Sequence, residues 1–303
     1  MFLALDVGNT QTTYGLIADK IEDSATPISD CNALQQCEGA VPQQSGSGTG
    51  QQSAGKKVLP LEEVVKLWRT QTFKNDTADE LAIKLHELFA CSPYSLADVD
   101  AVGVSCVVPS LFHAWTTALD RLNLKGDLIR ATDYLSTGLI APDIAAPETI
   151  GADRLANAAE ARRTYGSPAI VVDFGTATNI DVVDNQGYFV GGSISPGLML
   201  SAGALFERAG MLSDTPIQMP AHAIGTTSEE NLQAGLVLGW AGMVDGLVAR
   251  IKDELGLDEN AQCAVIGTGG LMSLMSDAAH CFTHLDADLT IRGIRYLYDL
   301  KHN

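Results

Sequence analysis

The sequence predicts an α/β protein made of two similar halves, each with a mixed sheet flanked by helices. One observation is a repeated phrase: LALDVGNTQTTYGL near the start returns downstream as IVVDFGTATNIDVV, with Asp6 and Asp173 at matching positions. A second is the order of the apolar runs, because both halves read strand, strand, strand, helix, strand, helix. The length of 303 residues also suits two domains of about 150 residues. We therefore expect domains at residues 1–145 and 146–303.

The first half is expected to begin with two strands joined by a tight turn. Residues 31–57 follow, and they are rich in Gln, Gly and Ser with few large apolar side chains. Such a composition buries too little surface to offset its ordering entropy, so a disordered insertion is predicted there. Thr77 and Glu80 have the spacing of a capping box and predict the start of a helix. The other predicted elements are strands at 63–72 and before Pro109, a helix at 110–122, a short strand near Leu128 and a connection at 132–150.

The second half is expected to open with a helix that starts in GADRLANAAEARRTYG and stops at Gly166. A strand at 169–173 then leads through the second copy of the phrase into a glycine-marked strand, GYFVGGSISPG. Two longer helical segments, at 198–210 and 228–255, precede a strand in QCAVIGTGG. A helix at 290–300 closes the chain, so that this half also interleaves strands with helices.

Composition and charge narrow the class of protein. The formal net charge of −18 argues against nucleic acid as a partner, because phosphate backbones are bound by surplus Lys and Arg. The six cysteines contain no CxxC pair, so neither a disulfide framework nor a zinc site is predicted. No apolar run approaches the roughly 18 residues of a membrane helix, and the N-terminus lacks the basic region of a signal peptide. These features predict a cytoplasmic protein without a membrane segment.

The repeated phrase has a chemical use. A strand that ends in Asp and turns through Gly into a second strand exposes backbone N–H groups and hydroxyls at its tip. Such a tip can bind phosphate oxygens, and the carboxylate can hold a metal ion or its waters. A single Asp-x-Gly turn is equally well explained as ordinary turn chemistry. Two copies, one in each half, favour two phosphate-binding turns that face each other across a cleft.

Several motifs resemble those of one enzyme family. The two turns resemble the phosphate loops of the actin-like, sugar-kinase and Hsp70 ATPase superfamily, which implies duplicated actin-like (ribonuclease H-like) domains. The sequence IGTGG at 266–270 resembles the adenosine-contacting loop of that superfamily. The order of DVGNT, GADR, DFGTAT and GGSISPG is similar to that in type III pantothenate kinases, and GADRLANAAEA is the most specific element. No Walker A sequence occurs, so a P-loop kinase is not expected.

This resemblance implies an ATP-dependent enzyme that phosphorylates pantothenate to 4′-phosphopantothenate, the first step of coenzyme A biosynthesis. It also implies ATP with Mg²⁺, a monovalent cation (K⁺ or NH₄⁺) and a homodimer. By resemblance, the ATP phosphates are bound by residues of both turns, namely Asp6, Val7, Gly8, Asn9, Thr10, Gln11, Thr12, Thr13 and Thr176. The alternative role of the hydroxyls in this set is the capping of their own turns.

The resemblance assigns the remaining roles. Asp153 would be the general base that accepts the proton of the substrate hydroxyl, although an Asp in a first helical turn also suits the helix dipole. Asp173 would bind the monovalent cation, or would alternatively cap its own hairpin. The family's substrate contacts correspond to Gly151, Ala152, Asp153, Arg154 and Ser228. Arg154 could instead be a surface ion-pair partner.

Three positions depart from the family pattern. They are Asn179 after GTAT, Ser228 where GTTSEEN would be expected to hold threonine, and Ile144 where an aromatic residue often stands. These departures change the expected lining of the substrate pocket and leave the catalytic groups intact. Two other hypotheses stay open, a different small-molecule kinase on the same scaffold and a nucleotide-binding transcriptional accessory factor. The presence of Asp153 and Asp173 favours catalysis.

Overall fold

The structure is a computed structural model that describes residues 1–18, 57–58, 64–208, 215–258 and 261–302. All of these residues belong to one compact unit. It contains two mixed β-sheets flanked by helices, so the predicted α/β class is confirmed. The predicted disordered insertion at 31–57 lies outside the described residues except for Lys57, which is placed in a strand.

The first sheet has the strand order β4-β2-β1-β5-β6. The strand β1 pairs antiparallel with β2 and parallel with β5, while β4 continues the antiparallel side and β6 the parallel side. Five of the six residues of β1 are buried, which explains its nearly continuous apolar sequence. The strands of this sheet are β1 (Phe2–Val7), β2 (Gln11–Ile17), β4 (Val64–Gln71), β5 (Ala101–Cys106) and β6 (Gly126–Leu128).

The second sheet repeats this arrangement. Its order is β3-β11-β10-β7-β8-β9, in which β7, β8 and β9 are antiparallel neighbours and β10 runs parallel to β7. The strands β7, β8, β9, β10 and β11 thus occupy the places of β1, β2, β4, β5 and β6, so the duplication expected from the repeated phrase is present. The bounds are β3 (Lys57–Val58), β7 (Ala169–Phe174), β8 (Ala177–Val183), β9 (Phe189–Pro196), β10 (Ala264–Gly269) and β11 (His284–Leu285).

Helices cover both faces of each sheet. One face of the first sheet packs on α1 (Ala78–Ala90) and α2 (Phe112–Arg121), with Leu85 and Trp115 fully buried in that core. The capping box of Thr77 and Glu80 is present at the start of α1, as predicted. The outer face of the second sheet packs on α6 (Gly239–Glu254) and α7 (Met272–Ala278).

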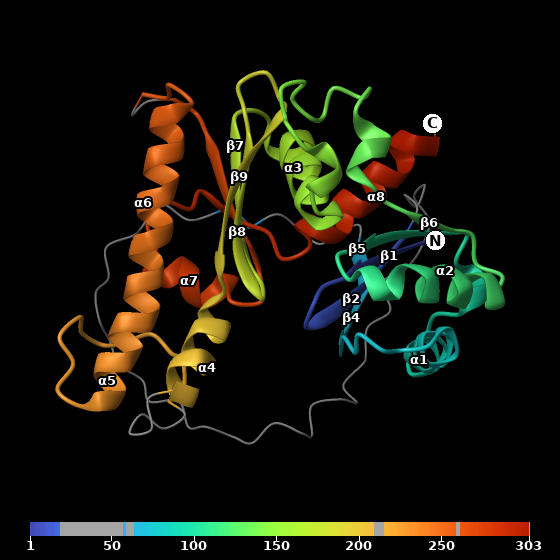
Figure 1. Cartoon of the computed structure of the whole chain (residues 1–303), viewed down its shortest axis with the longest axis horizontal. Helices are drawn as coiled ribbons and strands as arrows, with labels where there is room; N and C mark the ends of the chain where they lie inside the picture. Colours follow the sequence, from blue (N-terminus) through green and yellow to red (C-terminus); the bar gives the residue numbers. More distant parts are fainter. Residues whose placement is uncertain (19–56, 59–63, 209–214, 259–260, 303) are drawn as a thin grey trace, which may run out of the picture. The chain divides into compact units, whose positions relative to one another are not determined.

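Two helices occupy the space between the sheets. The helix α3 (Ala152–Tyr165) packs on α8 (Leu289–His302); α8 contacts β1 of the first sheet, and α3 contacts β7 and β8 of the second (Figure 1). Phe2, Leu155 and Ile294 share one buried cluster, so the last helix of the chain packs against its first strand. The proposed domain boundary at 145/146 divides the sequence into two halves. In the structure, α8 of the second half packs on β1 of the first sheet.

A long helical stretch precedes β10. It consists of α5 (Ser228–Gln233), a π-helical segment (Ala234–Leu238) and α6, and a shorter helix, α4 (Leu198–Arg208), follows β9. By length and composition alone the stretch Ser228–Glu254 could cross a membrane, with a mean hydropathy of 1.4 over its most apolar window, which corrects the expectation that no such segment exists. A core helix of a soluble protein passes the same test, and 39% of this window is buried inside the protein.

Candidate functional site

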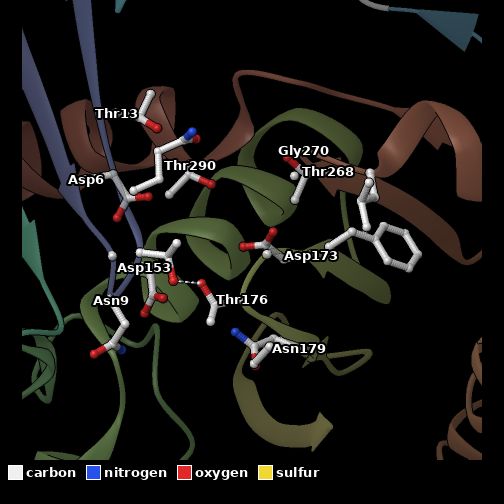
Figure 2. A pocket seen from close by; sticks show the side chains of 18 of the residues that line it. Asp6, Asn9, Thr13, Asp153, Asp173, Thr176, Asn179, Thr268, Gly270 and Thr290 are labelled. Carbon is white, nitrogen blue, oxygen red and sulfur yellow. Dashed lines mark hydrogen bonds between the residues drawn. The ribbon is translucent and has the colours of Figure 1, made fainter. Parts of the chain in front are cut away.

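A cavity of about 680 Å³ lies where the two hairpin turns approach each other. Its wall includes residues of both sheets and of α3 and α8 (Figure 2). From the first sheet come Asp6, Gly8, Asn9, Thr10, Gln11, Thr13, Arg69 and Val107. From the rest of the chain come, among others, Asp153, Asp173, Thr176, Asn179, Thr268, Gly270 and Thr290.

Each turn is closed by a backbone hydrogen bond from its glycine, and the first turn is one residue longer than the second. In the β1–β2 turn the N–H of Gly8 donates to the carbonyl of Gln11 at 3.0 Å. In the β7–β8 turn the N–H of Gly175 donates to the carbonyl of Ala177, also at 3.0 Å. The tips meet, because the hydroxyl of Thr176 donates to Oγ1 of Thr10 at 3.0 Å (Figure 2). The predicted pair of facing turns is therefore present, and their exposed hydroxyls line one cavity.

Three carboxylates project into this cavity from three different elements. Asp6 and Asp173 are the second-last residues of β1 and β7, and Asp153 lies in the first turn of α3 (Figure 2). Burial, with smaller contributions from the charges of Asp153 and Asp173, raises the pKa of Asp6 to about 8. Burial and the charge of Asp153 raise the pKa of Asp173 to about 6. The charge of Asp153 thus raises the pKa of both other acids, and a cavity lined by three carboxylates is suited to cations.

The start of α3 fixes the position of Asp153. Its Oδ1 accepts a hydrogen bond from the backbone N–H of Arg154 at 2.8 Å. A Cβ atom on Gly151 would lie 2.3 Å from the same Oδ1, so only glycine leaves room for the carboxylate at this place. Burial raises the pKa of Asp153, and the N–H and charge of Arg154 oppose that shift. A carboxylate of raised pKa at the cavity wall can accept a proton from a bound hydroxyl near neutral pH.

A short hydrogen-bonded chain holds Asp173. The amide of Asn157, which is 1% exposed, donates to Oδ2 of Asp173 at 3.3 Å, and the hydroxyl of Thr290 donates to Oδ1 of Asn157 at 2.7 Å. Asn157 lies one helical turn after Asp153 on α3. The sequence interpretation missed both Asn157 and Thr290, although a polar residue among the alanines of a buried helix is a recognisable signal.

The donor set fits a divalent cation that is bound mainly through phosphates and water. Among the residues that the structure describes, no three His, Cys, Asp or Glu side chains lie close enough together to hold a metal ion by themselves. Mg²⁺ commonly takes one or two carboxylates and completes its shell with water and substrate phosphates. Asp6 beside the first turn offers one such carboxylate, with Ser105 donating to its Oδ1 at 3.1 Å.

A second cavity of about 470 Å³ lies beyond α3 and is lined by Ile144, Arg154 and Phe189, among others. The guanidinium of Arg154 lies over the ring of Phe189. Its Nε donates at 2.6 Å to Oδ1 of Asp181, a fully buried carboxylate on β8. Arg154 is therefore an anchored cation at a cavity wall, which differs from the surface ion pair considered as its alternative role.

Most of the predicted residues are brought together, but some are not. Nine of them line the first cavity, namely Asp6, Gly8, Asn9, Thr10, Gln11, Thr13, Asp153, Asp173 and Thr176. The side chains of Val7 and Thr12 are buried, and Oγ1 of Thr12 shares a 2.7 Å hydrogen bond with Oγ1 of Thr72. Gly151 and Ala152 line neither cavity, although they place Asp153. Ser228 is exposed on α5 and also lies away from both.

The adenosine-contacting loop expected at 266–270 lies at the first cavity. Thr268, Gly269 and Gly270 line it, at the end of β10. The backbone of Gly269 has φ +89°, and a Cβ there would lie 2.5 Å from Oδ1 of Asp173. The neighbouring apolar lining includes Met199 and Leu200, which the sequence interpretation did not single out. Of the three departures, Asn179 lines the first cavity and Ile144 the second.

Comparison with known proteins gives consistent matches over most of the chain. The family model described as type III pantothenate kinase matches residues 56–250. A type III pantothenate kinase of Roseiflexus sp. (strain RS-1) is 36% identical over 242 residues, which cover 80% of this chain and 92% of the relative. The type III pantothenate kinase of Saccharopolyspora erythraea is 33% identical over 300 residues, which cover 99% of this chain and 98% of the relative.

A solved structure supports the fold. The protein from Campylobacter jejuni whose name assigns it to the Baf family of transcriptional activators aligns with a TM-score of 0.51, covering 99% of each chain. Its sequence identity is 15%, so the match shows a common fold and does not extend to activity.

Proposed function

This chain belongs to the type III pantothenate kinase family, and from that membership we propose that it transfers the γ-phosphate of ATP to a hydroxyl of pantothenate. The product is 4′-phosphopantothenate, the first intermediate on the route to coenzyme A. The observation that carries the proposal is the first cavity, where two glycine turns rich in hydroxyls face a half-buried carboxylate on a helix N-terminus. The accessory-factor hypothesis has no comparable support in the residues of the site.

The proposed reaction needs one proton acceptor. Asp153 accepts the proton of the pantothenate hydroxyl while that oxygen forms a bond to the γ-phosphorus and the bond to the ADP oxygen breaks. The raised pKa of Asp153 brings it closer to the operating pH, which is the condition for efficient general-base catalysis. Its fixed position, set by Gly151 and the N–H of Arg154, holds the carboxylate ready for that transfer.

The nucleotide is proposed to lie along the first cavity. Gly8, Asn9, Thr10 and Thr13 present hydroxyls, an amide and backbone N–H groups from one side, and Thr176 presents its hydroxyl from the other. Val7 and Thr12 contribute only backbone groups, because their side chains are buried. The contact between Thr10 and Thr176 places the two turns close enough for one triphosphate to touch both.

Two cations complete the proposed site. Mg²⁺ with ATP would be held by Asp6 and would neutralise phosphate charge. A monovalent cation, K⁺ or NH₄⁺, would be held by Asp173, whose carboxylate is oriented by Asn157 and has no ion pair among the described residues. Burial raises the pKa of both Asp6 and Asp173, and a bound cation would favour their charged forms, which supports cation binding near them.

The acceptor substrate is proposed to extend from the first cavity towards the second. Asp153 and Arg154 are neighbours on α3, yet the first lines one cavity and the second lines the other. Pantothenate carries a hydroxyl at one end and a carboxylate at the other. Its hydroxyl can contact Asp153 while its carboxylate binds Arg154. Gly151 and Ala152 would contribute through the backbone at the start of α3.

We also propose a homodimer in the cytoplasm, where ATP is available. Exposed apolar side chains outside both cavities lie on β9, on α4 and in the segment before α5, namely Ile194, Leu205, Met219 and Ile224. Burial of such a surface favours association. Ser228 lies away from both cavities of its own chain, so a role in substrate binding would require a second copy.

The proposal is tested by ADP release from the purified protein with ATP and either pantothenate or N-acetylated sugars. We expect release that depends on pantothenate and is stimulated by K⁺ relative to Na⁺, with the stimulation lost in Asp173→Asn. Phosphorylation of a sugar in preference to pantothenate would support the alternative of another small-molecule kinase. Equal rates in the two salts would remove the basis for the cation assignment alone.

A further inference from the structure

We propose that Arg69 binds the terminal phosphates of the nucleotide in the first cavity. This inference rests on the proposed kinase function and assigns it a residue that neither the repeated turns nor the GADR segment contains. Arg69 lies on β4, two residues before the end of that strand, and lines the cavity together with the β1–β2 turn.

The charges of the cavity create a need for such a residue. Asp6, Asp153 and Asp173 line it, and a triphosphate would add several negative charges. Among the described residues that line this cavity, Arg69 is the one Lys or Arg side chain. A bound Mg²⁺ and a monovalent cation would neutralise only part of this negative charge. The guanidinium of Arg69 would add a positive charge, which the two turns do not contain.

The strand register places Arg69 beside the phosphate-binding residues. In the antiparallel pairing of β2 with β4, Arg69 is directly opposite Thr13. Side chains of directly opposed residues lie on the same face of a sheet, with their Cβ atoms about 4.5–5.5 Å apart. Thr13 and Arg69 both line the cavity. The strand register therefore places the guanidinium of Arg69 on the same wall as the first turn.

Arg69 is available for a ligand. It is an exposed residue, and no hydrogen bond or ion pair joins its guanidinium to the part of the chain that the structure describes. Asp288, which is 1% exposed and lies just before α8, interacts electrostatically with Arg69. Burial and the charge of Asp286 raise the pKa of Asp288, and the charge of Arg69 opposes that shift. Neither carboxylate oxygen of Asp288 has a hydrogen-bond partner. Arg69 and Asp288 therefore attract each other, while the donors of the guanidinium remain without a partner among the described residues.

The phosphates are a better match for Arg69 than the carboxylate of pantothenate. That carboxylate already has a cation in Arg154, which lines the second cavity and is anchored by Asp181. Arg69 instead shares its wall with the turn that starts at Asp6. A guanidinium can bind two phosphate oxygens at once through parallel N–H groups, which an ammonium cannot do in the same way.

The test compares Arg69→Met and Arg69→Lys with a matched control, Lys66→Met. Lys66 lies on the same strand but lines neither cavity. The dissociation constants of ATP, adenosine and inorganic tripolyphosphate are measured by calorimetry, and the KM values of ATP and pantothenate by ADP release. Charge-assisted hydrogen bonds of this kind predict about ten- to a hundredfold weaker binding of ATP and tripolyphosphate by Arg69→Met.

We expect adenosine binding and the KM of pantothenate to change by less than about twofold in Arg69→Met, because the contact is to phosphate alone. Arg69→Lys keeps the charge and should lose less affinity, and Lys66→Met should match the wild type. Unchanged ATP and tripolyphosphate binding in both Arg69 variants would overturn the proposal. So would a rise confined to the KM of pantothenate, since it would assign Arg69 to the acceptor.

The binding measurements test the role of Arg69 independently of the proposed kinase function. A wild-type protein that binds tripolyphosphate through Arg69 but phosphorylates no pantothenate would contradict the kinase proposal and support the phosphate site. A wild-type enzyme that phosphorylates pantothenate, with Arg69 variants that bind phosphates normally, would support the kinase proposal and contradict the phosphate site at Arg69. If Arg69→Met does not fold, Arg69→Lys decides between these outcomes by the same measurements.

Discussion

The side chains of the site are acidic residues whose environments disfavour their charge. Asp6, Asp153, Asp173 and Asp181 all have raised pKa values, in each case chiefly because burial removes water from the carboxylate. The first three face a cavity that is open to cations. Asp181 differs, because it is fully buried and has an arginine partner.

Asp181 gives a pH dependence that can be checked. Burial, only partly offset by Arg154 and reinforced by Asp153 and Asp173, raises its pKa from 3.8 to about 8. The unfolded chain therefore loses this proton at lower pH than the folded chain. Stability from this group is fully present below the unfolded pKa and is lost as pH rises towards about 8. We expect the free energy of unfolding in urea to fall across that range.

Asp181→Asn removes the titrating group and keeps one acceptor oxygen for Arg154. The fall in the free energy of unfolding with pH should be shallower in this variant than in the wild type. Asp120→Asn, which changes an exposed aspartate on α2, serves as the control and should keep the wild-type slope. A slope in Asp181→Asn that is identical to that of the wild type would show that Asp181 is ionised throughout.

Among the helices and strands, those whose formation depends on neighbouring residues were predictable from the sequence. The strands β1 and β7 were predictable because both are apolar runs that end in Asp and a glycine turn. The start of α1 was predictable because Thr77 and Glu80 satisfy its first N–H groups. The short elements α7 and β11 were missed, since seven and two residues carry too little periodicity to be recognised.

Site residues that belong to one of the two turns could be predicted from the sequence. Site residues that reach the cavity through contacts between distant segments could not. Asp6 and Thr176 follow from the turns themselves. Arg69 enters the cavity because of the register between β2 and β4, and Thr290 enters it because α8 packs back onto the first sheet. Such long-range contacts leave no periodic signal near the residue concerned.

The end of β10 offers a test at this scale. Gly269 has φ +89°, and a Cβ would collide with Oδ1 of Asp173 at 2.5 Å. We expect Gly269→Ala to lose about 1–3 kcal/mol of stability from backbone strain. We also expect it to lose the activation by K⁺, because the carboxylate of Asp173 must move.

Gly270→Ala is the matched control for that change. A Cβ at Gly270 would meet no atom within 4 Å, so stability and the K⁺ response should be close to those of the wild type. Thermal unfolding and ADP release in the two salts provide both readouts. Normal K⁺ activation in Gly269→Ala would show that the close approach to Asp173 has no functional role.

At the scale of the whole molecule, duplication explains the cleft. The first sheet presents the β1–β2 turn and the second sheet presents the β7–β8 turn. The two turns face each other, so a phosphate chain can be bound from both sides. The helices α3 and α8 lie between the sheets and carry Asp153 and Thr290 to the same cavity. The repeated phrase predicted the two turns, while the position of α8 follows only from packing.

The Gln-, Gly- and Ser-rich segment is predicted to be dispensable. Its composition suggests little buried surface. Lys57 must be kept, because it begins β3, which pairs with β11. We expect deletion of residues 31–55 to leave thermal stability and pantothenate-dependent ADP release close to those of the full chain. Loss of soluble protein, or of most of the activity, would show that the segment packs against a structured part of the chain.

The central claim is that Asp153 is the general base of pantothenate phosphorylation, and the turnover of Asp153→Asn tests it most directly. The control is Asp79→Asn, which changes another first-turn aspartate, on α1, away from both cavities. We predict that kcat falls by about 10²–10⁴ in Asp153→Asn, while the fold is retained and the KM of ATP changes much less. A variant that keeps more than about a tenth of the wild-type kcat, with an unchanged pH profile, would contradict the assignment.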